Sequence, residues 1–362
     1  MERFGVRRQR SRRGGPRSEN GRRAVRSESE SAAGRTGRRL GVAVALAAVL
    51  TGSGCAASTD VGPVLPAAVP RVPNPVGSVV PYSGPVPAPD CDVRQSLTPG
   101  TLPSPGRMPA GGTLAAIQER GWLTVGVDQA TQYFAAPNPS TGALEGFDIA
   151  MAREVAKAIF GDPEKIRYRV VTPAQRMQVL KSGQVDLVVD TLSITCDRRK
   201  DADFTSPYYT DSQMLLVPVN SDAKRLEDLG GQKVCASVGS TLIQRILETD
   251  VTPKPIAYGV TDRADCLVAM QRGEVAAATT YQGLLAGLAA QDPQTKIVGT
   301  ANTVEYQGFG VPKGHEDFVR FLNAHLERIK GNGTWQQIYA TWIKGHVPEQ
   351  GPPAAYYTGC RA

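Results

Sequence analysis

The chain has 362 residues, with 41 Lys and Arg residues against 34 Asp and Glu residues, and a formal net charge of +7. The first 39 residues hold 13 Arg and 4 Glu, so the chain from Leu40 onward has a net charge of −2. The positive charge therefore belongs to the N-terminus, and the body lacks the excess of basic residues typical of nucleic-acid binding.

An apolar run over 40–50 follows the basic N-terminus and leads into small residues and Cys55. Such an order is typical of a secretory signal, and the run is shorter than the roughly 20 residues that a membrane span needs. We expect residues 1–54 to be a basic leader and signal peptide. Cys55 resembles the lipidated cysteine of bacterial lipoproteins, and an ordinary cleaved signal peptide is the alternative.

Residues 56–110 contain 13 of the 27 prolines and little apolar periodicity. Such a segment cannot bury enough surface to offset its ordering entropy. We therefore expect residues 55–110 to form an extended tether, with the folded body beginning near Gly111.

Helical and strand patterns alternate along the first part of the body. The predicted helices cover 113–120, 145–157 and 175–181, and the predicted strands cover 122–127, 167–171 and 185–189. This alternation predicts parallel βαβ units and an α/β fold, which binds ligands at the carboxyl ends of its strands.

Small hydroxyl residues and an arginine follow the predicted strand 185–189. Thr191 and Ser193 come first, and Arg198 follows after about one helical turn. An arginine fork can bind a carboxylate through two hydrogen bonds, while hydroxyl and backbone N–H groups complete the site. The segment therefore predicts a socket for a free carboxylate.

The segment 186–209 resembles the signature of the family 3 extracytoplasmic solute-binding proteins of polar amino-acid ABC transporters. Further matching segments follow the family's order: 144–149, 226–234, 237–241, 306–314 and 332–342. The resemblance implies a two-lobed clamp of the type II periplasmic-binding-protein class, in which each lobe is a mostly parallel sheet with flanking helices.

The same resemblance places the boundaries of the lobes. Lobe 1 would cover 111–212 plus 307–345, and lobe 2 would cover 213–306. The strands 213–217 and 305–307 would be the two crossings between the lobes, and residues 346–362 would form a C-terminal tail.

In lobe 1, the resemblance implies that Arg198 binds the α-carboxylate of the ligand, with Ser193 beside it. Thr191 would meet the ligand amine. The alternative for Arg198 is a surface ion pair with the neighbouring Asp197 or Asp201.

In lobe 2, the turn Gly239, Ser240 and Thr241 precedes a predicted helix, whose N-terminus offers free N–H donors to an anion. The resemblance implies that Thr241 closes on the carboxylate. A plain helix N-cap by Ser240 or Thr241 is the alternative, and both roles are compatible.

Arg176 resembles the arginine with which glutamate- and aspartate-binding members bind the side-chain carboxylate. An exposed arginine in the first turn of a helix is the alternative. Two arginines in one cleft require a ligand with two acceptor groups. This favours glutamate and aspartate, followed by glutamine and asparagine.

Tyr281 departs from the family pattern, because it stands where an aspartate usually accepts the ligand α-ammonium. A phenol offers an oxygen but no charge. Asp190, Glu145 or Asp128 could supply the charge, unless neutral oxygens hold the amine or the ligand has no amine.

Five cysteines remain beside Cys55, which indicates an oxidising compartment and one unpaired thiol. Cys235 and Cys266 resemble a disulfide in lobe 2 of some family members. Cys91 and Cys360 flank the body and are expected to pair, leaving Cys196 as a buried free thiol. His315, His325 and His346 are scattered, so no metal or cofactor is expected, and surface or capping roles are expected for them.

We therefore expect a monomeric lipoprotein on the outer face of the cell membrane that binds a free amino acid by clamp closure. An ABC permease or a membrane sensor protein would be its partner, and no enzymatic activity is expected. The alternative is an enzyme that resembles cyclohexadienyl dehydratases and acts on prephenate or arogenate, with Glu145 as a candidate general acid.

Overall fold

The computed structural model describes residues 76–81, 91–299 and 303–358. The leader, Cys55 and Cys360 lie outside these ranges. Among the helices of the described ranges, none combines the length and the apolar character that crossing a membrane requires.

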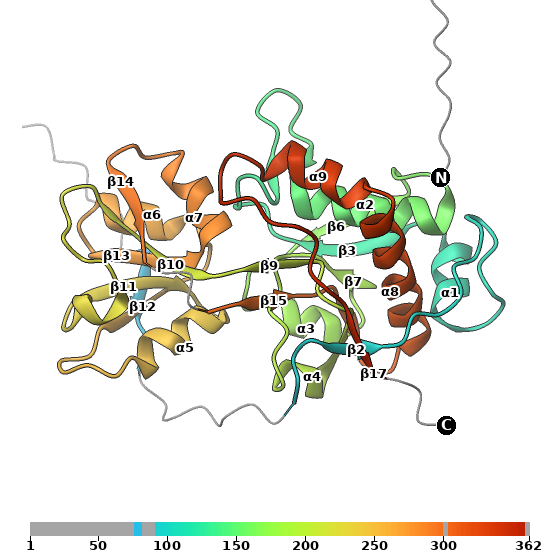
Figure 1. Cartoon of the computed structure of the whole chain (residues 1–362), viewed down its shortest axis with the longest axis horizontal. Helices are drawn as coiled ribbons and strands as arrows, with labels where there is room; N and C mark the ends of the chain where they lie inside the picture. The colour runs from blue at the N-terminus through green and yellow to red at the C-terminus, as the bar shows by residue number, and fades with distance from the viewer. Residues whose placement is uncertain (1–75, 82–90, 300–302, 359–362) are drawn as a thin grey trace, which may run out of the picture. The chain divides into compact units, whose positions relative to one another are not determined.

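Lobe 1 is built on a five-stranded sheet (Figure 1). Its strands, in spatial order, are β6 (Ile166–Val170), β3 (Leu123–Val127), β7 (Leu187–Val188), β16 (Gly310–Pro312) and β8 (Ala202–Phe204). β3 is parallel to β6 and β7, and β16 is antiparallel to β7 and β8. The lobe's helices are α1 (Gly112–Arg120), α2 (Phe147–Phe160), α3 (Arg176–Lys181), α4 (Arg198–Asp201), α8 (Glu316–Gly331) and α9 (Thr334–Trp342).

The predicted helices and strands of lobe 1 are confirmed, with small shifts at their ends. α2 begins two residues later than predicted, because Gly146 precedes it at φ 133° and leaves no room for a side chain against the Phe134 carbonyl. α1 ends at Gly121 and α2 ends at Gly161. Both glycines have the left-handed backbone conformation that commonly terminates helices.

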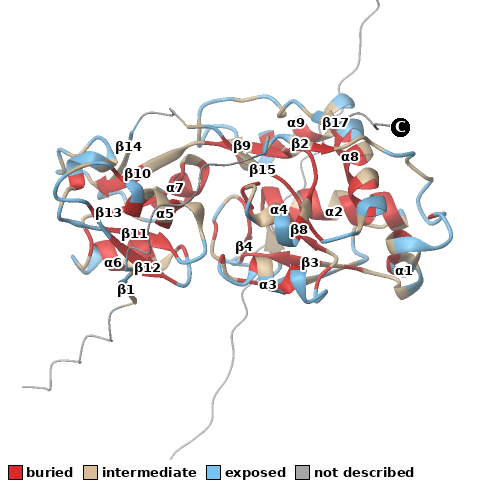
Figure 2. Ribbon diagram, turned by 90° about the horizontal axis from the view of Figure 1, so that it is seen from below, coloured by how far each residue is buried: buried red, intermediate tan, exposed pale blue. Residues whose placement is uncertain are grey.

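Lobe 2 is built on a six-stranded sheet. Its strands, in spatial order, are β1 (Gly77–Val79), β12 (Ile256–Val260), β11 (Lys233–Ser237), β13 (Ala277–Tyr281), β10 (Gln213–Pro218) and β14 (Thr295–Val298). β11 is parallel to β12 and β13, so three carboxyl strand ends share one edge. The 3-10 helix η1 (Leu226–Leu229) and the helices α5 (Thr241–Glu248), α6 (Asp265–Gln271) and α7 (Gln282–Ala289) complete the lobe. In both lobes the buried residues follow the strands and the helix faces against them (Figure 2).

A two-stranded antiparallel sheet, β9 (Tyr209–Asp211) with β15 (Glu305–Gln307), joins the two lobes. The expectation for 305–307 agrees with β15, but 213–217 was expected as the other crossing and instead lies in β10, inside the sheet of lobe 2. This segment lies inside the sheet because Leu215, Leu216 and Val217 are consecutive apolar residues and all are buried, as in a strand covered on both faces. A short hairpin of β4 (Ala136–Pro137) and β5 (Leu144–Glu145) belongs to lobe 1.

The expected tether is structured over part of its length, contrary to the prediction for 55–110. β1 extends the sheet of lobe 2, and β2 (Gln95–Leu97) pairs in parallel with β17 (Tyr356–Thr358) from the expected tail. Ser96 is buried, donates to the Phe204 carbonyl at 2.8 Å and accepts from Asn323 Nδ2 at 2.8 Å. Hydrogen bonds to lobe 1 thus help to order part of a segment that has little apolar periodicity.

Two disulfides are present, and one corrects the expected pairing. Cys235 and Cys266 are bonded, as the resemblance implied. Cys91 is bonded to Cys196 and not to Cys360, so Cys196 is not a free thiol. The reason is local: Arg199 Nη2 donates to the Val93 carbonyl at 3.1 Å and brings this segment beside α4.

One of the three histidines, His325, differs from the expected surface or capping role, and the other two agree with it. His325 is buried in α8 because it shares the apolar face of Phe321 and Ile329 at helical spacing. His315 occupies the N-cap position of α8, with Nδ1 2.8 Å from Thr113 Oγ1. His346 is exposed and stacks on Tyr133.

Candidate ligand-binding site

The turn after β7 is held in a strained conformation at the centre of the predicted carboxylate socket. Thr191 has φ +42°, which is uncommon for a β-branched residue. Its backbone N–H donates to Asp148 Oδ2 and to the Tyr208 hydroxyl, both at 3.0 Å. Its hydroxyl is buried and has no hydrogen-bond partner in the described part of the chain. Strain and an unpaired polar atom are both costly, and they are typical of a loop shaped for a ligand.

Arg198 reaches from lobe 1 to lobe 2. Its Nη1 donates to the Ser193 carbonyl at 2.8 Å, and its Nη2 donates to the Gly239 carbonyl of lobe 2 at 3.0 Å. The alternative surface ion pairs are not formed, because Asp197 pairs with Lys200 and Asp201 pairs with Lys181. The guanidinium therefore lies where the two lobes meet, and it contacts both.

Tyr281 connects hydroxyl groups from both lobes. Its hydroxyl lies 2.8 Å from Thr241 Oγ1 and also contacts Ser193 Oγ. Burial raises the pKa of Tyr281, so the phenol is neutral and offers one oxygen to two hydroxyl neighbours. Ser240 is at the N-cap position of α5, but its Oγ donates to the Ser237 carbonyl at 2.6 Å and caps no N–H group.

Arg176 is buried at the start of α3, so the alternative of an exposed arginine is wrong. Its Nε donates to the Pro173 carbonyl and its Nη1 to the Asp190 carbonyl, both at 3.0 Å. Nε also lies 3.6 Å from Asp190 Oδ2. Burial lowers the pKa of Arg176 to about 10, which still leaves it charged at neutral pH. All of these partners belong to lobe 1.

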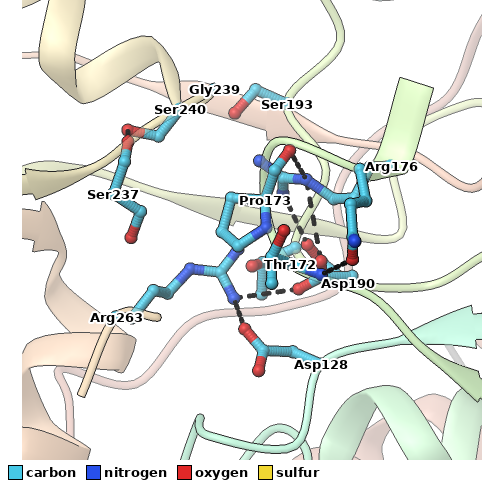
Figure 3. Close-up of polar contacts among 12 residues, drawn as sticks. Asp128, Thr172, Pro173, Arg176, Asp190, Ser193, Ser237, Gly239, Ser240 and Arg263 are labelled. Carbon is cyan, nitrogen blue, oxygen red and sulfur yellow. Dashed lines mark hydrogen bonds and ion pairs between the residues drawn. The ribbon is translucent and has the colours of Figure 1, made fainter. Parts of the chain in front are cut away.

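Arg263 is a site residue that the sequence analysis missed. It lies between β12 and α6 in lobe 2, and its Nη1 forms ion pairs with Asp128 and, at 2.9 Å, with Asp190 of lobe 1 (Figure 3). Burial alone would lower the pKa of Arg263, but Asp190 and Asp128 raise it above its usual value. The sequence position of Arg263 could have indicated this role. Arg263 follows β12, which is parallel to β11, so it lies at the same sheet edge as Gly239, which follows β11.

Asp128 and Asp190, two of the three candidates for the missing charge, are therefore engaged with Arg263. The third candidate, Glu145, accepts a hydrogen bond from Asn138 Nδ2 at 2.9 Å. Asp148 lies beneath Thr191, and burial raises its pKa to about 8 although it accepts a hydrogen bond from the Tyr208 hydroxyl.

Two α/β lobes joined by the strands β9 and β15 are the architecture of the two-lobed solute-binding class. Residues 123–345 match the family described as bacterial extracellular solute-binding proteins, family 3. The chain belongs to this family, whose members bind their ligands outside the cytoplasm.

Similar proteins of known function include amino-acid-binding proteins. The ABC transporter glutamine-binding protein GlnH of Bacillus subtilis is 37% identical over 233 residues, which cover 64% of this chain and 85% of that protein. The glutamate-binding protein GluB of Corynebacterium efficiens is 30% identical over 267 residues, covering 70% and 90%.

Among solved structures, the ancestral amino-acid-binding protein AncCDT-1, a precursor of cyclohexadienyl dehydratase, is 30% identical with a TM-score of 0.59. The match covers 64% of this chain and 100% of that chain. The similarity thus extends to an amino-acid-binding protein that is a precursor of an enzyme.

Proposed function

We propose that this chain is a receptor for a free acidic or amide L-amino acid, which it binds by closure of the two lobes. The observation that carries the proposal is the position of Arg198, whose guanidinium contacts Ser193 on its own lobe and Gly239 on the other. A ligand carboxylate placed there replaces backbone carbonyl acceptors with a charged acceptor, which strengthens the hydrogen bonds.

The ligand amine meets the unpaired hydroxyl of Thr191 and the hydroxyls of Ser193, Thr241 and Tyr281. Oxygen atoms without formal charge can accept its hydrogen bonds. The far end of the ligand points toward the buried arginines beside Asp190. A second carboxylate can accept hydrogen bonds there, so glutamate and aspartate come first, and glutamine and asparagine follow.

Closure requires that the ligand bind the closed form more tightly than the open form. The closed receptor then presents both lobes to a membrane partner, an ABC permease or a sensor protein. The lipidated Cys55 holds the protein as a monomer on the outer face of the cell membrane. The signal-like N-terminus supports this placement.

Calorimetric titration tests the proposal. The protein from residue 56 onward is unfolded and refolded to remove bound ligand, then titrated with glutamate, aspartate, glutamine, asparagine and prephenate. Binding of at least one of the amino acids is expected, and Arg198→Ala weakens it about tenfold to a hundredfold. Arg225→Ala, which changes an exposed arginine of lobe 2, serves as the control.

The enzyme alternative has a distinct outcome in the same experiment. Tyr281 cannot supply the charge that an α-ammonium group usually meets, and prephenate has two carboxylates and no amine. Turnover of prephenate without binding of any of the four amino acids would overturn the receptor proposal.

A further inference from the structure

Four buried charged side chains meet at one end of the cleft. The exposed fractions are 4% for Asp128, 1% for Asp190, 3% for Arg176 and 6% for Arg263. Their formal charges balance when all four are ionised. Buried charges persist only when they are paired, so this balance is a condition for the closed arrangement.

The two arginines differ in the lobe from which they come. Arg176 makes its contacts to Pro173 and Asp190, within lobe 1. Arg263 belongs to lobe 2, and its contacts to Asp128 and Asp190 cross between the lobes. Without Arg263, the part of the group that belongs to lobe 1 has a net charge of −1. Closure therefore brings in the charge that neutralises this end of the cleft.

Arg263 also retains hydrogen-bonding capacity. Its two contacts both use Nη1, and within the described ranges Nε and Nη2 make no hydrogen bond. Arg176 uses Nε and Nη1 on backbone carbonyls. The group is close to the predicted ligand socket, because Asp190 directly precedes Thr191 in the chain.

We propose that Arg263 is the specificity-determining residue of this cleft. It neutralises Asp128 and Asp190 on closure and offers its remaining N–H groups to the acceptor on the ligand side chain. A ligand with a carboxylate side chain can bind because Arg263 cancels the net negative charge of the lobe 1 part of the group. This inference rests on the proposed amino-acid receptor function. It assigns recognition of the ligand side chain to a residue of lobe 2.

Two variants that change the charge in opposite directions test the inference by calorimetry with glutamate and glutamine. Arg263→Gln leaves a net charge of −1, which repels a side-chain carboxylate but not an amide. Its affinity for glutamate should fall about tenfold or more relative to that for glutamine. Asp128→Asn leaves a net charge of +1 and should shift the ratio toward glutamate.

The double variant Arg263→Gln/Asp128→Asn restores neutrality and should return the ratio toward that of the wild type. Arg272→Gln is the matched control, because Arg272 is another arginine of lobe 2, 3.7 Å from Glu274 and outside the group. It should leave both affinities unchanged. Circular dichroism establishes that each variant is folded. If Arg263→Gln does not fold, the direction in which Asp128→Asn shifts the ratio of glutamate affinity to glutamine affinity decides the test.

Equal losses for glutamate and glutamine in Arg263→Gln would overturn the inference, because Arg263 would then only hold the lobes together. An unchanged ratio in both single variants would also overturn it, while the receptor function would stand. Failure of the wild type to bind any amino acid would overturn both proposals.

Discussion

Gly239 of lobe 2 lies directly against Ala174 of lobe 1. A Cβ atom at Gly239 would be 2.6 Å from Ala174 Cα and 2.9 Å from Ala174 N, and the residue has φ +79°. These are backbone atoms, which cannot move aside by rotation of a side chain. The hydrogen bond from Arg198 to the Gly239 carbonyl therefore requires glycine at this position.

Gly239→Ala should keep the lobes from closing, and it should weaken ligand binding about tenfold or more. Calorimetry measures the affinity, and small-angle scattering at saturating ligand should give a larger radius of gyration than the wild type. Gly273→Ala is the matched control: Gly273 has φ +67°, and nothing lies within 4 Å of its added Cβ. Normal closure of Gly239→Ala would contradict the assigned contact.

Tyr281→Phe should weaken amino-acid binding about tenfold. The substitution removes the oxygen that Ser193 and Thr241 share across the lobes, and it leaves the buried Ser193 hydroxyl and the half-buried Thr241 hydroxyl without this partner. The control is Tyr168→Phe, because the Tyr168 hydroxyl is buried and has no partner among the residues that the structure describes. If both variants bind with wild-type affinity, Tyr281 does not connect the lobes.

The features that sequence predicted well are local. Periodicity located β3, α2 and α3 to within a few residues, because the apolar residues of each element recur at short, regular spacings in the sequence. Ser193 and Arg198 are in contact because both follow β7 at its carboxyl end, and Thr191 lies in the same turn. Thr241 follows a parallel strand of lobe 2, β11, and is linked to Ser193 through the Tyr281 hydroxyl.

The features that sequence did not predict depend on contacts between distant residues. Arg263 and Asp128 are 135 positions apart, and nothing near either residue indicates the other. The pairing of Cys91 with Cys196 likewise depends on how the segment before β2 lies against α4. Charge and hydrogen bonding decide these contacts, and neither leaves a periodic pattern.

Cys196→Ala should lower the free energy of unfolding by about 2–4 kcal/mol, because the disulfide closes a loop of 105 residues in the unfolded chain. Cys91→Ala/Cys196→Ala should lose a similar amount, because the bond is absent from both variants. Urea unfolding without reductant measures the change. Cys360→Ala is the matched control and should cause no loss. A loss in Cys360→Ala and in the double variant, but not in Cys196→Ala, would instead support the pairing of Cys91 with Cys360.

His325 should make the protein less stable in acid. Burial, together with the nearby charges of Arg328 and Lys157, lowers its pKa to about 3. The unfolded chain binds this proton below a pKa of about 6.5, so between these values the unfolded state binds more protons. Stability should therefore fall as pH decreases through this window, by up to about 1.4 kcal/mol per pH unit from this group.

His325→Gln removes this titration and should flatten the dependence of the unfolding free energy on pH between pH 6 and pH 4. Urea unfolding across this range measures the slope, and the difference from the wild type cancels the titration of carboxylates common to both proteins. His346→Gln is the control, because that imidazole is exposed and stacks on Tyr133. The substitution of a buried side chain lowers stability at every pH, so the slope and not the absolute value is decisive. Equal slopes in His325→Gln and the wild type would mean that the buried imidazole accepts a proton without unfolding.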